Sequence, residues 1–380
     1  MTAQTQTKRR VKVAVLGVGL MGKHHARNIA YFDPNAELVA VSDIKPEALE
    51  WARAELPPTV KTYSSSEELL ANPEVEAVLI ATETAKHADL AIKSIRAGKA
   101  STGTQLPSSL VPLRHSLIEK PISLDADESK RVVAEAKLHP ELKVMVAFSR
   151  RFDESYNEAA ARIKAGKLGT PYLIKSCTND KYDSTGRFLA YSKHSGGIFI
   201  DCGIHDIDIG RWLLDVGNPA KLKNPTKQVT RVFATGLNTV YPELEAQGDC
   251  DNAIGVIEFE NGTKFNIHLS RTSMHGHDVI CEVFGTESKL VINENPNISR
   301  VEIRDAHGVR MESHPSFYER FKGAFVTEIQ TFSKCILDDI AVPTPPQDAL
   351  EAAQIAMALT HSFRTGMPVF FGDDGQPIFA

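Results

Sequence analysis

The stretch "VKVAVLGVGLMGKHHARNIAYF", residues 11–32, constrains the fold more than any other part of the chain. It opens with a mostly apolar, β-branched run that ends in glycine, which predicts a buried parallel strand. Gly17, Gly19 and Gly22 then fit the pattern G-x-G-x-x-G, and a helical pattern follows. Strand, glycine loop and helix in this order predict a nucleotide-binding unit, because a pyrophosphate can approach the amino end of the helix.

The three glycines have different predicted roles. Gly17 permits the tight turn, Gly19 lets the backbone approach a phosphate, and Gly22 allows close packing of helix on strand. Asp43 ends the next predicted strand, 21 residues after Gly22, where its carboxylate can accept hydrogen bonds from a ribose diol. This acid favours NAD over NADP, because a carboxylate repels a 2′-phosphate. Lys45 nearby keeps NADP open as an alternative.

Strand and helix patterns alternate through residues 1–148, which predicts a doubly wound parallel sheet of the Rossmann type. The apolar run at 75–82 is typical of a third strand, and 86–98 has helical spacing with a glycine at its end. From 149 to 380 the pattern changes to short β-like runs separated by turn pairs such as "ENG". We expect a second, α+β domain there, with an open and mainly antiparallel sheet.

Composition excludes several classes of partner. The net charge is −5 and no long basic run occurs, so nucleic acid and anionic membranes are not expected to bind. No window approaches the roughly 18 apolar residues that a membrane span needs. The five cysteines are scattered and form no C-x-x-C pair, which argues against a disulfide framework and a structural zinc site. We therefore predict a cytoplasmic protein.

A set of motifs resembles the Gfo/Idh/MocA family of pyranose and polyol oxidoreductases and follows its order along nearly the whole chain. These motifs are "GVGLMGKHHARNI", "TETAKHADLAIKSIRAGK", "EKPIS", "VAFSRRFDESY", "GKLGTPYLIKS", "GGIFIDCGIHDIDIGRWLL" and "SFYERFKGAFVTEI". The block "DCGIHDIDIGRW" looks most like that of the family's inositol 2-dehydrogenases. One departure is Glu83, where the family often has proline.

The resemblance implies NAD-dependent oxidation of a secondary alcohol of a cyclic polyol, myo-inositol or a stereoisomer, to the ketone by hydride transfer. It also implies a homodimer or homotetramer formed through the sheet of the second domain. Two alternatives stay open. One is an NADP-linked aldose dehydrogenase or reductase. The other is a non-catalytic regulator that senses dinucleotides, which the presence of Lys120 and His205 disfavours.

Lys120 is the first predicted catalytic residue. It follows a predicted parallel strand at the sheet edge where such folds bind ligands, and Pro121 favours an extended backbone at Lys120 and permits a cis bond. The resemblance assigns this lysine to positioning of the substrate and the nicotinamide. The plainer alternative is a surface ion pair between Glu119 and Lys120.

Asp201 and His205 are the other two predicted catalytic residues. In a helix they lie four residues apart and face the same way, beside an apolar stripe of isoleucines. Histidine titrates near neutrality and can take the hydroxyl proton, while Asp201 can orient the imidazole or bind a neighbouring hydroxyl. The resemblance matches this pair to a D-x-x-x-H motif of inositol dehydrogenases. A core histidine and a metal site that includes Asp208 are the alternatives, and we predict no metal.

The remaining predicted residues fall into two groups. Besides the glycines and Asp43, the predicted cofactor-binding residues are Leu20, Met21, Thr82, His87, Glu119 and Lys120. Besides Asp201 and His205, the predicted substrate-binding residues are Arg150, Arg151, Tyr172, Asn179 and Tyr318. For the two arginines a packing or salt-bridge role is an equal alternative, and Tyr318 could equally be a core aromatic residue.

Residues 100–114 interrupt the first domain without any periodicity. Without this segment the sequence reads helix, glycine, short turn and strand, which is normal for an α/β unit. A helix-to-strand connection lies at the sheet edge opposite the ligands, so we expect a surface excursion remote from the chemistry. It is either a genuine insertion or a translated in-frame intron. We favour the intron, because excision restores the unit cleanly.

Overall fold

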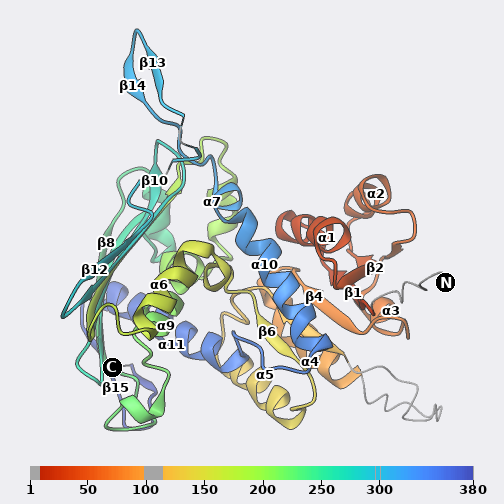
Figure 1. The fold of residues 1–380 in the computed structure, drawn as a ribbon, viewed down its shortest axis with the longest axis horizontal. Helices are drawn as coiled ribbons and strands as arrows, with labels where there is room; N and C mark the ends of the chain where they lie inside the picture. The colour runs from red at the N-terminus through yellow and green to blue at the C-terminus, as the bar shows by residue number, and fades with distance from the viewer. Residues whose placement is uncertain (1–8, 98–113, 296, 300, 380) are drawn as a thin grey trace, which may run out of the picture. The chain divides into compact units, whose positions relative to one another are not determined.

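The computed structural model describes residues 9–97, 114–295, 297–299 and 301–379 (Figure 1). The chain divides into two compact units. The first consists of Met1–Ser149 with Gly323–Leu350, and the second of Arg150–Lys322 with Glu351–Ala380. The segment Gly323–Leu350 thus groups with the first unit, whereas the sequence prediction placed it in the second domain.

The first unit contains a six-stranded sheet with the order β3-β2-β1-β4-β5-β6, and every pairing in it is parallel. This confirms the predicted Rossmann sheet. Chain order reverses between β1 and β4, which is the switch point where such sheets bind ligands. The strands are β1 (Val11–Leu16), β2 (Ala36–Ser42), β3 (Lys61–Tyr63), β4 (Ala77–Ile80), β5 (His115–Ile118) and β6 (Val144–Val146).

Five helices alternate with these strands in the described part of the first unit. Because crossovers to the two sides of β1 are both right-handed, α1 and α4 cover opposite faces of the sheet (Figure 1). The central strands β1 and β4 are almost entirely buried, as their apolar sequences predict. The helices are α1 (Leu20–Phe32), α2 (Pro46–Glu55), α3 (Ser66–Leu70), α4 (Thr84–Ala97) and α5 (Ala126–Leu138).

The second unit is built on an eight-stranded sheet with the order β12-β11-β7-β10-β9-β8-β15-β16. Its described pairings are antiparallel except that of β7 with β10, which is parallel. The predicted open, mainly antiparallel sheet is therefore confirmed, with one parallel pair at its centre. The strands are β7 (Pro171–Lys181), β8 (Val229–Leu237), β9 (Asn252–Phe259), β10 (Lys264–Ser273), β11 (Asp278–Gly285), β12 (Lys289–Ile292), β15 (Val369–Phe371) and β16 (Pro377–Ile378).

Helix α9 lies on one face of this sheet. Two glycines allow the close approach: a Cβ atom on Gly203 would lie 2.8 Å from Leu269 Cδ1, and one on Gly210 would lie 2.7 Å from the Phe265 ring. A separate hairpin is formed by β13 (Ile303–Asp305) and β14 (Gly308–Arg310). The helices that occur from residue 150 onward are α6 (Glu154–Lys164), α7 (Arg187–Ser192), α8 (Ile198–Asp201), α9 (Gly203–Leu213), α10 (Phe317–Leu337) and α11 (Pro346–Thr365). Helix α10 is interrupted by non-helical backbone angles at Phe321.

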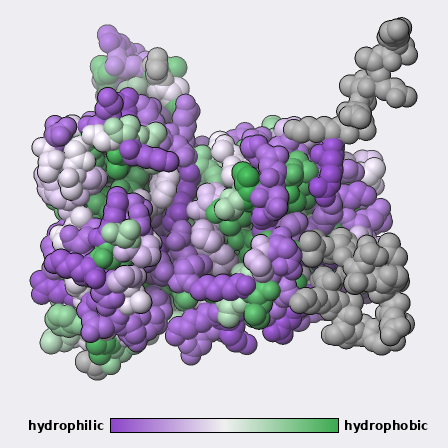
Figure 2. Space-filling model, turned by 60° about the horizontal axis from the view of Figure 1, so that its bottom comes forward, coloured by the Kyte–Doolittle hydropathy of each residue, from purple (hydrophilic) through white to green (hydrophobic). Residues whose placement is uncertain are grey.

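The other face of the sheet carries exposed apolar side chains. Phe233, Leu237, Ile254 and Phe370 alternate along β8, β9 and β15 with buried residues. Elsewhere, the side of the molecule shown in Figure 2 is mainly hydrophilic, with hydrophobic residues in small, separated groups. Within the part of the chain that the structure describes, no helix combines the length and the apolarity that a membrane span requires.

Candidate active site

The glycine loop between β1 and α1 has the geometry that the sequence predicts. Gly17 has φ +87°, and a Cβ atom there would lie 2.6 Å from the carbonyl oxygen of Ala81. A Cβ atom on Gly22 would lie 1.9 Å from the carbonyl oxygen of Gly17, so helix and strand could not pack as they do. On Gly19 it would meet no described atom within 4 Å. Glycine at position 19 is thus not required by the fold and suits the approach of a ligand.

Asp43 is held against this loop by backbone hydrogen bonds. Its Oδ2 accepts the N–H of Val18 at 2.7 Å, and its Oδ1 accepts the N–H of Lys45 at 2.9 Å. Helix α1 has no side-chain cap at Gly19 and no acidic residue in its first turn, so its first N–H groups are available to an anion. These features fit NAD. The residues that would hold it are Gly17, Gly19, Leu20, Met21, Gly22 and Asp43.

Lys120 lies at the same sheet edge as the glycine loop. It follows β5, and the N–H of the preceding residue Glu119 bonds the carbonyl oxygen of Ile80 at 2.9 Å. Thr82 continues from β4, and its backbone nitrogen would lie 2.7 Å from a Cβ atom on Gly17. Lys120 is half-buried, and its bond to Pro121 is cis. The first unit therefore brings the predicted lysine and the predicted dinucleotide loop to one edge.

Glu119 and His87 hold the turn at Lys120 and Pro121 in place through hydrogen bonds. Glu119 Oε1 lies 2.6 Å from His25 Nε2, and Glu119 Oε2 accepts the N–H of Lys120 at 3.2 Å. Burial opposes ionisation of Glu119, but the His25 bond and nearby positive charge outweigh it, so its pKa lies below its ordinary value. The two ring nitrogens of His87 contact the carbonyl oxygens of Pro121 at 2.9 Å and Thr82 at 3.1 Å. Both residues were predicted to bind the cofactor, but these contacts favour a supporting role.

Arg271 is the centre of a polar cluster on the second unit. Its Nη2 donates to Asp201 Oδ2 at 2.8 Å, and its Nη1 donates to Asp180 Oδ2 at 3.0 Å. The Tyr191 hydroxyl donates to Asp201 Oδ1 at 2.9 Å, and His277 Nδ1 lies 3.2 Å from Asp180 Oδ1. Burial opposes the charge on Asp180, but His277 and Arg271 outweigh it and lower the pKa of Asp180. Both carboxylate oxygens of Asp201 thus accept a hydrogen bond from this cluster.

His205 lies one turn after Asp201, but not in the same helix. Helix α8 ends at Asp201 and α9 begins at Gly203, with Cys202 between them at φ −92° and ψ −55°. This angle stays in the helical region, so the predicted spacing of four residues still approximates one turn. His205 is half-buried, beside the buried isoleucines that the sequence predicts.

Sequence reasoning missed Arg271, Tyr191, Asp180 and His277. A signal existed for Arg271. In β10 the buried apolar residues recur at every second position as far as Leu269, and Arg271 takes the next position in this series. An arginine on the buried face of a strand requires carboxylate partners.

Arg150 and Arg151 are bound within the second unit. Arg151 forms a bidentate pair with Asp208, with Nε–Oδ2 2.8 Å and Nη2–Oδ1 2.6 Å. Arg150 Nη1 donates to Asp206 Oδ1 at 2.9 Å. All four residues are buried, and the salt-bridge alternative is therefore favoured over the prediction that the arginines bind substrate. The Arg151 pair also occupies the carboxylate of Asp208, which disfavours the metal-site alternative.

Asn179 and Tyr172, which were predicted to bind substrate, do not face the Arg271 cluster. Side chains on a strand alternate between faces, and Thr178 Oγ1 donates to Asp206 Oδ2 at 2.8 Å on the face that α9 covers. Asp180 continues that face, whereas Asn179 lies on the other. Tyr172 is exposed at the start of β7, about 26 Å along the strand from Asp180.

Tyr318 stays a candidate. It is half-buried, and its neighbours Phe317 and Phe321 pack edge-on against the ring of His277 at 6.4 Å and 6.1 Å. His277 in turn contacts Asp180. Tyr318 therefore lies on the segment that packs against the Arg271 cluster.

Two family profiles match the chain. One, described as "Oxidoreductase family, NAD-binding Rossmann fold", covers residues 11–148, and the other, "Oxidoreductase family, C-terminal alpha/beta domain", covers residues 160–371. The chain belongs to the Gfo/Idh/MocA family of oxidoreductases. The predicted family and fold are thereby confirmed, and NAD is confirmed as the cofactor of its first unit.

Relatives in this family include inositol dehydrogenases. The chain is 36% identical over 360 residues to scyllo-inositol 2-dehydrogenase (NAD(+)) of Bacillus subtilis, covering 94% of this chain and 96% of the relative. It is 31% identical to inositol 2-dehydrogenase of Rhizobium meliloti, covering 93% and 96%. A crystal structure of scyllo-inositol dehydrogenase from Lactobacillus casei with bound NAD(H) and scyllo-inositol superposes with a TM-score of 0.84 at 29% identity, covering 95% and 99%.

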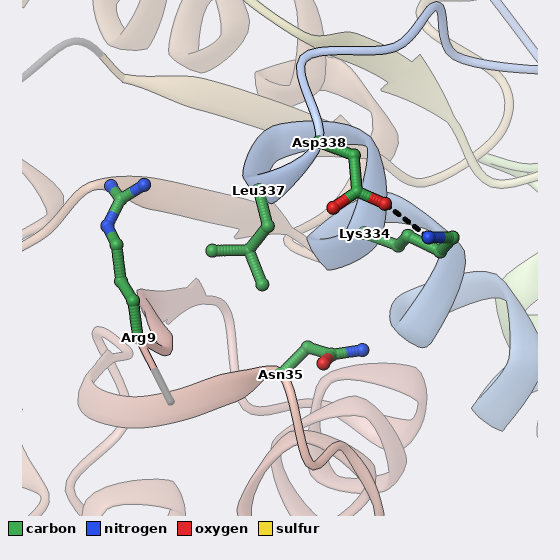
Figure 3. A pocket seen from close by; sticks show the side chains of 5 residues that line it. All are labelled: Arg9, Asn35, Lys334, Leu337 and Asp338. Atoms are coloured by element: carbon green, nitrogen blue, oxygen red, sulfur yellow. Dashed lines mark hydrogen bonds and ion pairs between the residues drawn. The ribbon is translucent and has the colours of Figure 1, made fainter. Parts of the chain in front are cut away.

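A hollow of about 340 Å³ on the first unit lies away from the family's cofactor loop (Figure 3). Leu337 projects between Arg9 and the ion pair of Lys334 with Asp338. Arg9 precedes β1, and Asn35, which also lines the hollow, precedes β2, so both mark the amino ends of parallel strands. The glycine loop and Asp43 follow the carboxyl ends of the same strands. The hollow therefore lies at the opposite edge of the sheet.

The segment 100–114 lies outside the described residues except for Arg114. That residue is buried, and its guanidinium donates to the carbonyl oxygens of Val75 and of Asn72, the latter at 3.1 Å. An excision that included Arg114 would remove these contacts from the first unit.

Proposed function

We propose that this family member oxidises a secondary hydroxyl of a cyclic polyol, myo-inositol, scyllo-inositol or a close stereoisomer, to the ketone with NAD. The observation that carries the proposal is the placement of Lys120 beside the glycine loop and Asp43 at one sheet edge. The relative with bound scyllo-inositol supports the choice of substrate class, as does the resemblance of Asp201 and His205 to the D-x-x-x-H motif of inositol dehydrogenases.

In the proposed reaction, NAD held by Gly17, Gly19, Leu20, Met21, Gly22 and Asp43 would supply the acceptor for the hydride that leaves the substrate carbon. His205 takes the proton of the hydroxyl as general base. The ammonium group of Lys120 donates a hydrogen bond to the substrate oxygen and stabilises the negative charge that develops on it. The carbon thus loses a hydride and the oxygen loses a proton, which leaves a ketone and an imidazolium.

Asp201 binds a neighbouring hydroxyl or orients the imidazole of His205. For either role its carboxylate has to keep one direction, and the hydrogen bonds from Arg271 and Tyr191 provide that constraint. Arg271 also places a cation beside Asp180, which favours the ionised form of that carboxyl group.

The test is a panel of cyclitols and aldoses, each assayed with NAD and with NADP by absorbance of the reduced cofactor. We expect the highest kcat/KM for an inositol stereoisomer with NAD. A higher kcat/KM for an aldose with NADP would support the pyranose dehydrogenase alternative. Binding of NAD without turnover of any substrate would support the non-catalytic regulator.

We further propose a cytoplasmic homodimer or homotetramer. The exposed apolar residues Phe233, Leu237, Ile254 and Phe370 lie on the sheet face that a second copy would cover. All five cysteines are free thiols, which suits a reducing compartment. Light scattering after size exclusion measures the mass. We expect Ile254→Lys to lower it, and a wild-type monomer would contradict the proposal.

A further inference from the structure

Glu328, on α10, is a fully buried carboxylic acid. The residue is 0% exposed, and neither side-chain oxygen hydrogen-bonds to any described residue. Burial, with the nearby Glu119 carboxylate, raises the pKa of Glu328 well above its ordinary value. The raised pKa favours the neutral acid, which carries an O–H that can donate.

Contacts between α1 and α10 fix the level at which Glu328 lies. The ring of His25 stands edge-on to Phe325 at 5.9 Å between centroids. Eight residues further along each segment, Ser333 Oγ of α10 donates to Oδ2 of Asp33, the residue that follows α1, at 2.7 Å. Both contacts lie in the first unit and are separated by the same number of residues in each segment. The two helices therefore run parallel, and residues at equivalent positions lie at the same level along them.

Asn28 and Glu328 each follow the first of these contacts by three residues and so lie at the same level. Asn28 is buried, and its Nδ2 has no hydrogen-bond partner among the described residues. The same holds for Nδ1 of buried His25. Buried polar groups in folded proteins are nearly always paired, often through an ordered water with several polar neighbours. His25 meets α10 at Phe325, and the register of the two helices brings Asn28 and Glu328 to one level a turn further on, so a single water could serve all three groups.

We propose that Glu328 and Asn28 hold a buried water that hydrogen-bonds to His25, and that this arrangement positions the Glu119–Lys120 turn. His25 Nε2 contacts Glu119 Oε1 at 2.6 Å, and Glu119 Oε2 accepts the N–H of Lys120 at 3.2 Å. A displacement of the His25 imidazole therefore also displaces Glu119 and, through its hydrogen bond, the backbone of Lys120. Glu328 is a positioning residue, and the inference rests on the proposed role of Lys120 in the oxidation.

Two variants of Glu328 test the inference in the full-length enzyme. Glu328→Gln keeps the size and the hydrogen-bonding groups, so we expect it to keep the wild-type kcat for myo-inositol. Glu328→Met keeps the volume but removes these groups. We expect it to lower kcat by about tenfold to a hundredfold, because small displacements at a reacting centre cost this much, while the Kd for NAD from fluorescence titration stays unchanged.

Lys334→Met is the matched control, since Lys334 is exposed on the same helix and is expected to leave kcat unchanged. A wild-type kcat in Glu328→Met would overturn the inference. So would a loss in Glu328→Gln as large as that in Glu328→Met.

A crystal structure of the wild-type protein gives a readout that needs neither turnover nor a stable Glu328→Met variant. We expect an ordered water within hydrogen-bond distance of Asn28 Nδ2 and the Glu328 carboxyl group. A dry contact there would overturn the inference whatever the enzyme oxidises. An ordered water in a protein that oxidises no cyclitol would support the water site and refute the proposed function separately.

Discussion

Replacement of Arg271 by methionine removes the cation that holds Asp201 and Asp180. Arg271 is 6% exposed, and its guanidinium donates to Asp201 at 2.8 Å and to Asp180 at 3.0 Å. Breaking a buried ion pair by removing one partner costs about 3–5 kcal/mol, because the other charge stays buried. We expect Arg271→Met to lower the free energy of unfolding by about that amount and to lower kcat/KM for the cyclitol, with the Kd for NAD unchanged.

Urea unfolding followed by circular dichroism measures the stability change, and a double-mutant cycle with Asp180→Asn tests its cause. If uncompensated charge is the reason, the double variant loses less than the sum of the single variants, by about 0.5–3 kcal/mol. Additive losses would refute this reasoning. The control is Arg231→Met: this arginine pairs with Glu258 on the surface, and its loss is expected to cost at most about 1 kcal/mol.

Three further predictions concern the first unit. Asp43→Asn should lower the NAD/NADP ratio of kcat/KM by about tenfold to a hundredfold, because hydrogen bonds to a charged group are worth about 1.5–3 kcal/mol; an unchanged ratio in initial-rate assays would count against the ribose contact. Burial and the charge of Lys143 lower the pKa of His115 to about 4. The unfolded state therefore binds more protons between about pH 4 and 6.5, and acidification across this window should cost up to about 3 kcal/mol. His115→Asn, which keeps an acceptor for the N–H of Lys143, should reduce this loss in thermal melts at pH 5 and pH 7. In peptide maps of the protein from its natural source, trypsin should release no peptide for residues 100–114 if they are a translated intron, and its detection would establish a genuine insertion.

The cofactor half of the site was predictable from the sequence because its residues are close in the chain. Gly17, Gly22 and Asp43 act through local turns and through the ends of adjacent strands, and the pattern of strand, glycine loop and helix specifies these. The parallel order of the strands follows from the alternation of strands and helices. Nothing in this part requires knowledge of a distant partner.

The substrate half was predicted only in part, because its contacts are distant in the chain. Arg151 and Asp208 are 57 residues apart, and no local sequence pattern shows which carboxylate a guanidinium group binds. Asn179 and Asp180 are adjacent in β7 but lie on opposite faces of the strand, and one residue of register decides which of them faces the Arg271 cluster. The parallel pairing of β7 with β10 likewise depends on strands far apart in sequence.

The burial of Glu328 is a third feature that could not be predicted from the sequence. In the sequence Glu328 is one charged residue in an amphipathic helix, where a glutamate is usually solvated. Its burial follows from the tertiary packing of α10, which the sequence does not specify.

The most direct test of the account is turnover by Lys120→Ala and His205→Ala, measured as NADH formed from the best cyclitol of the panel. A positioned general base contributes about 10²–10⁴-fold, and loss of one preorganised donor costs about 3–4 kcal/mol. We predict that each variant lowers kcat at least about a hundredfold, while the Kd for NAD stays at the wild-type value. Turnover near the wild-type rate in either variant would contradict the account.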